Sequence, residues 1–562
     1  MSETAFNTVK NLRTALLDAI GRSVADGSLP NEPLPDFNIE TPADRSHGDL
    51  ASNVAMVSAR AFKSAPRKIA ETIAAHLELE GTMLSRCEIA GPGFMNFFYD
   101  KSYYTAVINE IEQKGNTYGH SDFGGGKSVL VEFVSANPTG PMHIGNARGG
   151  ALGDALASVL SAAGYHVSRE FYVNDAGNQI EKFATSLEVR YLQLYKDGIE
   201  MPEDAYHGAD ITAHAKKFAE IHGDAYVNCD AKERRNALVS YALPLNIAQL
   251  EADLLTYRVK YDIWYRESTL HQSGAVKDII ERLKATGCTY EKEDALWFKA
   301  SDFGADKDFV LVRSNGIPTY VVPDIAYHYN KLVTRHFDKA IDILGADHHG
   351  YVPRLKAALT ALGVDASRLD VVLMQMVRVV RDGVEVKMSK RSGKAITLVT
   401  LLEEVPIDAA RFFFNMREAN SHFDFDLDLA IEKSAQNPVY YVQYAHARIC
   451  NIIKGLQETG IEQRACTAEE LALLTAPEEL ELIYKLSTMT GEIIAAAKDY
   501  DPSRMIRYVM DTSTLFHKFY NACRVKGEDE SLMQARLALC TATRTVIRNV
   551  LELFKIDAPE VM

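Results

Sequence analysis

An apolar run at residues 129–134, a loop rich in proline and glycine, and a long helical pattern follow one another without a break. The run has the length of a buried parallel strand, and apolar residues at helical spacing from Leu152 to Ala163 predict a helix that Gly164 ends. Strand character returns at His166–Val173. This β–loop–α–β order is typical of a doubly wound parallel sheet, so we expect an α/β fold that binds a nucleotide at the loop.

Two loops carry groups suited to phosphate binding. The first places His143, Gly145 and Asn146 at the start of the predicted helix, and the second places Lys387 and Lys390 after a hairpin predicted from Asp382-Gly383. Helix amides, the two polar side chains and the lysines can stabilise the charge that builds up when the α-phosphate of ATP is attacked. Either segment alone could be a capped helix or a solvated turn. Together, in this order, they favour an ATP site.

Composition excludes several classes of protein. The chain has 562 residues, enough for three or four domains, and a net charge of −15, which argues against a uniformly basic surface that coats nucleic acid but not against local basic stripes. The seven cysteines include no CxxC pair, so a disulfide framework or zinc knuckle is not expected and a reducing cytosol is. We find no apolar run of membrane-spanning length and no secretion signal at the N-terminus.

The pattern along the chain predicts three domains. Residues 1–115 are expected to form a small α/β domain, residues 116–400 a sheet domain with a mainly helical insertion at about 184–300, and residues 401–562 a helical domain with only helices after about 405. Four further strands are expected in the sheet domain. They lie at 309–312, 320–322, 339–344 and 371–380.

Further stretches support one family. They are Glu132-Phe-Val-Ser-Ala-Asn-Pro-Thr-Gly140, Tyr172-Val-Asn-Asp-Ala-Gly-Asn-Gln179, Tyr320-Val-Val-Pro-Asp-Ile-Ala-Tyr-His328 and Gly345-Ala-Asp-His-His-Gly-Tyr351. With the two phosphate loops, the chain resembles class I aminoacyl-tRNA synthetases, whose sheet domain bears an HIGH motif and a KMSKS loop, and more narrowly arginyl-tRNA synthetases. The resemblance spans nearly the whole chain and is weakest at 184–260.

The resemblance implies a Rossmann-like catalytic domain, an appended N-terminal domain that touches tRNA and an all-α anticodon-binding domain. It implies an arginine–tRNA ligase that uses ATP with Mg²⁺, L-arginine and tRNA(Arg), forms arginyl-adenylate only with tRNA bound, and is a cytoplasmic monomer.

A guanidinium group requires planar acceptors, and Glu132 and Asp324 are suitable ones. Glu132 lies between apolar Val131 and Phe133, where an unpaired carboxylate would be costly and a cationic ligand would offset the cost; the alternative is a structural salt bridge. By resemblance, other residues complete the arginine site. These are Tyr320, Gln375, Ser135, Asn137, Asp175 and Gln179. Asp175 and Gln179 could equally form a plain turn.

For ATP, the resemblance implies contacts from both loops and from the segment after the predicted strand 339–344. They are Pro138, Gly140, His143, Gly145, Asn146, Gly345, Asp347, His348, His349, Met388 and Ser389, with His143, Asn146, Lys387 and Lys390 in the catalytic roles. Asn146 replaces the second His of HIGH, which keeps a donor and removes a possible cation. Adjacent histidines lack a third well-spaced ligand, so no protein-bound metal is expected.

The RNA-facing residues are inferred less directly. Tyr440, Tyr444 and Arg448 share one predicted helix and could contact unpaired bases, although an aromatic stripe is more often part of a core. Asn53 in the N-terminal domain could touch tRNA or only shape its loop.

Two other functions fit part of the pattern. A nucleotidylyltransferase for a small metabolite also uses an HxGH turn, but such enzymes are usually far shorter and lack a helical RNA-binding tail. A catalytically silent RNA-binding relative is disfavoured by His143 and the two lysines, although Asn146 keeps this alternative open.

Overall fold

The central sheet of this computed structural model, which describes residues 2–387, 396–527 and 529–562, is fully parallel. Its five strands have the order β12-β11-β5-β6-β7. Their bounds are β5 (Ser128–Glu132), β6 (His166–Val173), β7 (Ile263–Arg266), β11 (Lys339–Gly345) and β12 (Leu369–Met374). Helix α5 (Ile144–Ala162) connects β5 with β6, as the sequence predicts, so the β–loop–α–β unit is confirmed.

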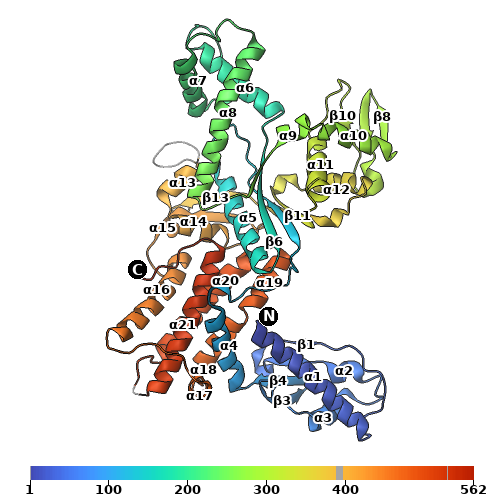
Figure 1. The fold of residues 1–562 in the computed structure, drawn as a ribbon, viewed down its shortest axis with the longest axis vertical. Helices are drawn as coiled ribbons and strands as arrows, with labels where there is room; N and C mark the ends of the chain where they lie inside the picture. Colours follow the sequence, from blue (N-terminus) through green and yellow to red (C-terminus); the bar gives the residue numbers. More distant parts are fainter. Residues whose placement is uncertain (1, 388–395, 528) are drawn as a thin grey trace.

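The N-terminal part folds around its own antiparallel sheet, in the order β1-β2-β4-β3. The elements are α1 (Glu3–Ala25), β1 (Ile39–Glu40), β2 (Leu50–Ser52), α2 (Val54–Ser58), α3 (Pro66–Ala75), β3 (Leu84–Ala90) and β4 (Phe94–Tyr99). Helix α4 (Lys101–Lys114) then leads to the parallel sheet and packs against helices of the C-terminal part. In Figure 1 this part lies at the lower right, beside the C-terminal helices.

Two groups of elements project from the central sheet on different sides (Figure 1). One is the helical group α6 (Asn178–Leu192), α7 (Ala209–His222) and α8 (Ala231–Thr256). The other contains α9 (Glu267–Gln272), α10 (Ala275–Ala285), β8 (Thr289–Lys292), β9 (Ala295–Phe298), β10 (Phe309–Val312), α11 (Val321–Tyr329) and α12 (Val352–Ala361). Strand β7, which belongs to the parallel sheet, lies between them and within the segment predicted as an insertion. The domain boundaries themselves remain predictions.

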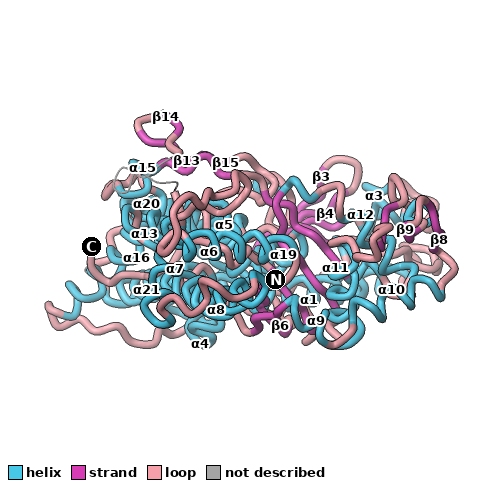
Figure 2. Tube along the Cα trace, turned by 90° about the horizontal axis from the view of Figure 1, so that it is seen from above, coloured by secondary structure: helices cyan, strands magenta, loops and turns pink. Residues whose placement is uncertain are grey.

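The C-terminal part is helical apart from a small sheet in the order β14-β13-β15. Figure 2 shows these strands at the outer edge of the molecule. The elements are β13 (Val377–Arg381), β14 (Val384–Glu385), α13 (Leu398–Glu404), α14 (Ile407–Phe414), β15 (Phe423–Asp426), α15 (Leu427–Ile431), α16 (Pro438–Gln457), α17 (Ala468–Leu471), α18 (Pro477–Ser487), α19 (Met489–Asp499), α20 (Ser503–Ala522) and α21 (Glu530–Leu553). One continuous apolar core joins these helices to α5 and β5.

The predicted hairpin is confirmed. Strands β13 and β14 are antiparallel, with Arg381 opposite Val384, and Asp382 and Gly383 both have positive φ, 51° and 73°. A two-residue turn with positive φ at both positions matches the twist of the flanking strands.

Three strand predictions are wrong or incomplete. Residues 321 and 322 begin α11 instead of forming a strand, because Pro323 fits the first helical turn, where its missing N–H costs nothing. The predicted strand 371–380 is two strands of different sheets, which separate at Gln375. The helix-only prediction after residue 405 missed β15, whose alternating phenylalanines are buried as it pairs with β13. No helix in the described part of the chain is long and apolar enough to cross a bilayer.

Candidate functional site

Several residues predicted to bind arginine or ATP lie at or just after the carboxyl ends of the parallel strands. Strands β6 and β7 lie on one side of β5, and β11 and β12 lie on the other, so the order reverses between β5 and β11. Ligands of open α/β sheets bind outside the carboxyl ends of the strands at such a reversal. Glu132 ends β5 and Gly345 ends β11, which places both at this edge.

The loop that leaves β5 has an unusual backbone. Val134 and Ser135 both have positive φ, 69° and 42°, a conformation that costs energy for residues with side chains and most of all for β-branched Val134. Surrounding groups hold it in place, since Tyr261 Oη donates to the Phe133 carbonyl at 3.0 Å and the Tyr172 N–H donates to Ser135 Oγ at 3.1 Å. The bend directs residues 135–143 over the end of the sheet.

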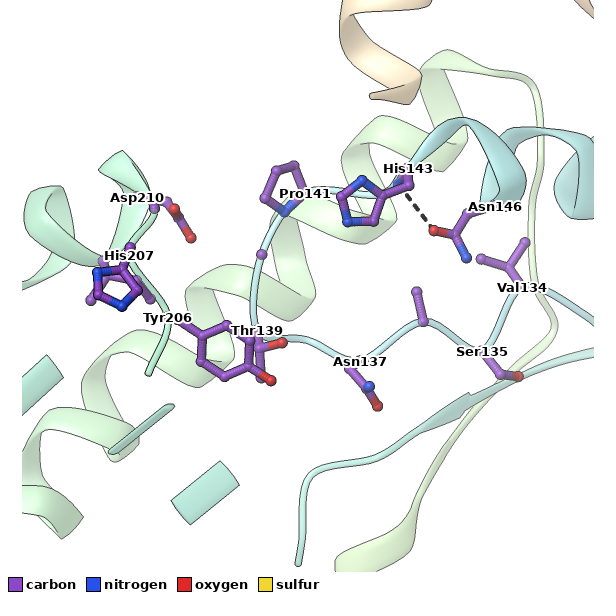
Figure 3. A pocket seen from close by; sticks show the side chains of 14 residues that line it. Val134, Ser135, Asn137, Thr139, Pro141, His143, Asn146, Tyr206, His207 and Asp210 are labelled. Atoms are coloured by element: carbon purple, nitrogen blue, oxygen red, sulfur yellow. Dashed lines mark hydrogen bonds between the residues drawn. The ribbon is translucent and has the colours of Figure 1, made fainter. Parts of the chain in front are cut away.

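Helix α5 begins with its N-terminus directed at the site. His143 is the N-cap residue, and its backbone N–H donates to Asn146 Oδ1 at 3.0 Å, as Figure 3 shows. The Asn146 oxygen is therefore used in capping, and its NH₂ group remains available to the cavity that this side chain lines. A Cβ on Gly145 would meet open space, whereas one on Gly153 would collide with the Phe133 ring, so glycine there permits α5 to pack closely on β5.

A cavity of about 500 Å³ lies along this loop. Asn137, Thr139, His143 and Asn146 line one side. The segment that leads into α7 supplies the other side, as Figure 3 shows, with Tyr206, His207 and Asp210. Asn246 of α8 connects the two sides, because its Nδ2 donates to the carbonyl of buried Pro138 at 3.0 Å and its Oδ1 lies 2.8 Å from His214 Nε2 of α7. Gly140 also lines the cavity.

The lysine loop returns to the start of α5. Thr397 pairs with His143 in an isolated β-bridge, and the Leu398 N–H donates to the Met142 carbonyl at 2.9 Å. Lys387 leaves the β13–β14 hairpin with 85% of its side chain exposed. The predicted residues Met388, Ser389 and Lys390 lie outside the described part of the chain.

Glu132 is buried, but it is not unpaired. Its Oε2 lies 2.5 Å from Lys331 Nζ, and its Oε1 accepts from Ser135 Oγ at 2.8 Å. The alternative named from the sequence, a structural salt bridge, is therefore present, and Lys331 offsets the burial of this carboxylate without a ligand. The role of Glu132 in arginine binding stays a prediction.

Asp324 has a different environment. It lies in the first turn of α11 and accepts a short hydrogen bond from Tyr351 Oη, and no lysine or arginine in the described residues forms an ion pair with it. Burial raises the pKa of its carboxyl to about 6, and the Tyr351 hydrogen bond opposes this shift. Tyr320 precedes it with 69% exposure, its ring stacked on Tyr351 at 5.9 Å between centroids.

Gln375 lies where β12 separates from β13. Its carbonyl accepts from Arg148 Nη1 at 2.7 Å, and its N–H donates to the Ala419 carbonyl at 2.9 Å. Arg148, on α5, is fully buried. The break between the sheets is thus fixed to the same helix that begins at His143.

The other predicted residues are placed as follows. Asp347, His348 and His349 are exposed in and after a 3₁₀ turn beyond Gly345, at the edge of the site, and His348 Nε2 lies 3.7 Å from Asp347 Oδ2. Asp175 accepts from the Ser268 N–H and Oγ, both at 2.8 Å, which ties the end of β6 to α9.

Asn137 is exposed, and Gln179 accepts from the Tyr206 hydroxyl. Gln179 therefore connects the start of α6 to the segment that closes the cavity.

The predicted RNA contacts lie elsewhere, on α16 and before α2 (Figure 1). Tyr440 and Tyr444 have parallel rings with centroids 6.4 Å apart. The Arg448 guanidinium lies 4.2 Å over Tyr520 and 5.9 Å from the Tyr444 ring. Asn53 accepts from the Asn38 N–H at 2.8 Å, which links the start of α2 to the segment before β1.

Sequence reasoning missed several residues of the site. Tyr206, His207 and Asp210 come from the segment with the weakest resemblance, and no pattern marks them. The sequence signal for Lys331 depends on recognising helix α11. Positions 320, 324, 328 and 331 share one face of a helix, a spacing that becomes visible only when 320–322 is recognised as a helix start.

Three family models match this chain in succession. They are described as the arginyl tRNA synthetase N terminal domain (residues 10–99), the catalytic domain of class I (R) tRNA synthetases (107–454) and the DALR anticodon binding domain (442–562). Similar curated proteins are the arginine–tRNA ligases of Ruminiclostridium cellulolyticum and Caldanaerobacter subterraneus subsp. tengcongensis. Each is 54% identical, and each alignment covers 98% of both chains.

Among solved structures, the arginyl-tRNA synthetase of Thermus thermophilus has a TM-score of 0.73 at 22% identity. The match covers 98% of this chain and 100% of that one. At this identity the likeness concerns the fold.

Proposed function

Because the chain belongs to the arginyl-tRNA synthetase family of class I tRNA synthetases, we propose that it is an arginine–tRNA ligase. It activates L-arginine with ATP to arginyl-adenylate and pyrophosphate, and it then transfers arginine to the 3′ end of tRNA(Arg). The observation that carries the arginine assignment is Asp324, a carboxyl at the site without an ion-pair partner among the described lysines and arginines.

The arginine side chain binds between α11 and the end of β5 in this proposal. Asp324 supplies the negative charge, Glu132 supplies a second planar acceptor, and a guanidinium has five donors in a fixed plane to match them. Tyr320 and Gln375 close the pocket. Ser135 and Asn137 hold the amino and carboxylate end, and Asp175 and Gln179 fix the surrounding walls.

ATP binds over the start of α5. The helix amides and its positive dipole end face the triphosphate, and the open space above Gly145 admits the adenosine. His143 and the Asn146 NH₂ group donate to phosphate oxygens, with Lys387 and Lys390 from the other loop. Pro138, Gly140 and Gly345 allow close approach of the backbone. Asp347, His348, His349, Met388 and Ser389 complete the contacts.

The chemistry needs no nucleophile from the protein. The arginine carboxylate attacks the α-phosphorus and displaces pyrophosphate, and the ribose hydroxyl at the tRNA terminus then attacks the adenylate carbonyl. Donors fixed around the phosphates stabilise the charge that develops in the first step. Mg²⁺ accompanies ATP as its phosphate-bound ion, since Mg²⁺ is usually bound through substrate phosphates and few protein carboxylates.

The RNA partner is tRNA(Arg), which contacts α16 through Tyr440, Tyr444 and Arg448 and the N-terminal part near Asn53. Adenylate formation waits for tRNA to bind. The protein acts as a monomer in the cytoplasm.

Aminoacylation by the purified protein tests this function. Radiolabelled arginine should become attached to tRNA(Arg) in the presence of ATP and Mg²⁺, whereas lysine and the neutral analogue citrulline should not. Attachment of a different amino acid would overturn the arginine assignment and keep the class. A complete lack of attachment to any tRNA would overturn the ligase assignment.

A further inference from the structure

A lysine without solvent contact lies directly behind the proposed arginine site. Lys331 is in a π-helical turn, Asn330–Thr334, that continues α11. Its side chain is 0% exposed, and its Nζ lies 2.5 Å from Glu132 Oε2 and 2.8 Å from Asp342 Oδ1. Burial disfavours the ammonium, but the two carboxylates outweigh this effect and raise the pKa of Lys331 above its ordinary value. Lys331 is therefore charged.

A histidine completes the group. His328 Nε2 lies 2.6 Å from Asp342 Oδ2, and its Nδ1 lies 2.7 Å from the Asp324 carbonyl. A carboxylate and a carbonyl are both acceptors, so both ring nitrogens are satisfied only when both carry a proton. The geometry thus indicates an imidazolium. It also joins Asp324, one proposed guanidinium ligand, to the group that holds Glu132, the other.

The charges of this group balance. Lys331 and His328 are positive, and Glu132 and Asp342 are negative. The carboxylate of Asp324 has no such cation paired with it among the described residues. Two carboxylates, Glu132 and Asp324, face the pocket, but the net charge there is minus one. This charge equals that of one guanidinium in magnitude.

The same atoms could suggest a metal site. Glu132, His328 and Asp342 are the one set of three potential ligands in the described residues whose ligand atoms lie within 4.8 Å of one another. The Lys331 ammonium lies within hydrogen-bond distance of both carboxylates, and it takes the place that a cation would occupy. Lys331 therefore pairs with these carboxylates in place of a metal ion.

We propose that Lys331, held by Asp342 and His328, is a positioning residue of the arginine site. It fixes the orientation of the Glu132 carboxylate and cancels its charge, so that the guanidinium meets a net charge of one at Asp324. This role rests on the proposed function, because it acts on arginine through Glu132.

Loss of the Lys331 ammonium would weaken arginine binding and leave ATP binding unchanged. Without Lys331, Glu132 and Asp342 are buried carboxylates in excess of the remaining cation, and such groups take up a proton. A protonated Glu132 presents a donor to a ligand that has only donors. The ATP contacts at the start of α5 include none of these residues.

The test is Lys331→Met, with Lys339→Met as the matched control. Lys339 is also ion-paired on this sheet, with Nζ 2.5 Å from Asp370 Oδ2, but it lies at the opposite, amino end of β11. Aminoacylation kinetics should show that Lys331→Met raises the KM for arginine about tenfold or more and leaves the KM for ATP within about twofold, whereas Lys339→Met changes neither. An unchanged arginine KM, or equal rises in both KM values, would overturn the proposal.

Asp342→Asn is the second variant that tests the role of Lys331. It is used if circular dichroism shows that Lys331→Met does not fold. The amide keeps the side-chain shape and an oxygen that can accept from His328, and Lys331 keeps Glu132 as its partner. The arginine KM should rise by about threefold or more with the ATP KM unchanged, and a parallel change in both would overturn the proposal. Charging of tRNA by the unaltered protein is measured alongside, so failure of the proposed function itself would be seen separately.

Discussion

At the scale of single residues, the two carboxyls of the proposed arginine pocket differ in their surroundings. Glu132 already has Lys331 and Ser135 as partners, whereas Asp324 has only the Tyr351 hydroxyl as a side-chain partner among the hydrogen bonds of the described residues. A bound guanidinium would therefore change the electrostatic state of Asp324 most.

Asp324→Asn should raise the KM for arginine by about 30-fold or more, because removing one partner of a largely desolvated charge pair costs about 2–5 kcal/mol. The KM for ATP should change little. Kinetics at saturating tRNA measure both values. Asp306→Asn is the matched control, since this carboxylate is exposed in the loop before β10 and has no part in the proposed site. Equal effects of the two variants on arginine would contradict the assignment.

Arginine binding by the unaltered protein should weaken as the pH falls below about 6. Burial raises the Asp324 pKa to about 6, so this carboxyl gains a proton in the folded protein at a pH where the unfolded chain is ionised. The neutral acid does not attract the guanidinium, and the arginine KM should rise about tenfold per pH unit below the pKa. The surrounding titratable groups are Tyr351, His328, Glu132 and Glu267.

A rise in pH has the opposite effect on protein stability. The contribution of Asp324 to the free energy of unfolding falls as the pH rises from about 4 to 6, because the folded state binds the proton more tightly there. Asp324→Asn should flatten the pH dependence of the arginine KM. The same pH profile for both proteins would contradict this prediction.

At the scale of elements, α5 and α11 show what could and could not be predicted from sequence. The strand, loop and helix around His143 were predictable because strand-length and helix-length apolar patterns adjoin a Pro/Gly loop. Helix α11 was not, because Tyr320-Val-Val has strand-like side chains and only tertiary burial of Val322 and Ile325 shows the helical face. The misassigned element concealed Lys331.

Asn146 has two separable roles at the start of α5. Asn146→Ala removes the acceptor for the His143 N–H and should lower the free energy of unfolding by about 1 kcal/mol, whereas Asn146→Asp keeps an acceptor at a helix N-terminus, where negative charge is favourable. Both variants lose the NH₂ donor and should raise the KM for ATP. Urea unfolding and kinetics measure the two effects. Loss of stability in both variants, or an ATP KM that neither changes, would contradict this division.

At the scale of the whole molecule, buried polar side chains join parts that are distant in sequence. Arg411 of α14 is fully buried. It lies 2.5 Å from Asp154 Oδ2 on α5 and donates to the carbonyls of Tyr257, after α8, and Phe554, after α21. Arg45 lies 3.6 Å over the Tyr484 ring, which links the N-terminal part to α18. The sequence predicted the parts but not these contacts, because no local pattern encodes which distant carbonyl an arginine will meet.

Arg411→Met should lower the free energy of unfolding by about 3 kcal/mol, which is at the lower end of the range for breaking a buried ion pair. The effect is limited because Asp154 still pairs with Arg169, whose Nε lies 2.9 Å from Asp154 Oδ1. Denaturant unfolding measures it. Arg464→Met, which removes an exposed arginine paired with Glu470, should leave the midpoint unchanged. Equal midpoints for the two variants would show that Arg411 does not join these parts.

The site at the start of α5 is proposed to use ATP to activate arginine for tRNA. Arginine-dependent exchange between ATP and labelled pyrophosphate tests this proposal most directly, measured with and without tRNA(Arg) and with each other amino acid in turn. We expect exchange with arginine that depends on tRNA and is lost in His143→Ala. Exchange driven by another amino acid, or no exchange with arginine and tRNA present, would contradict the proposal.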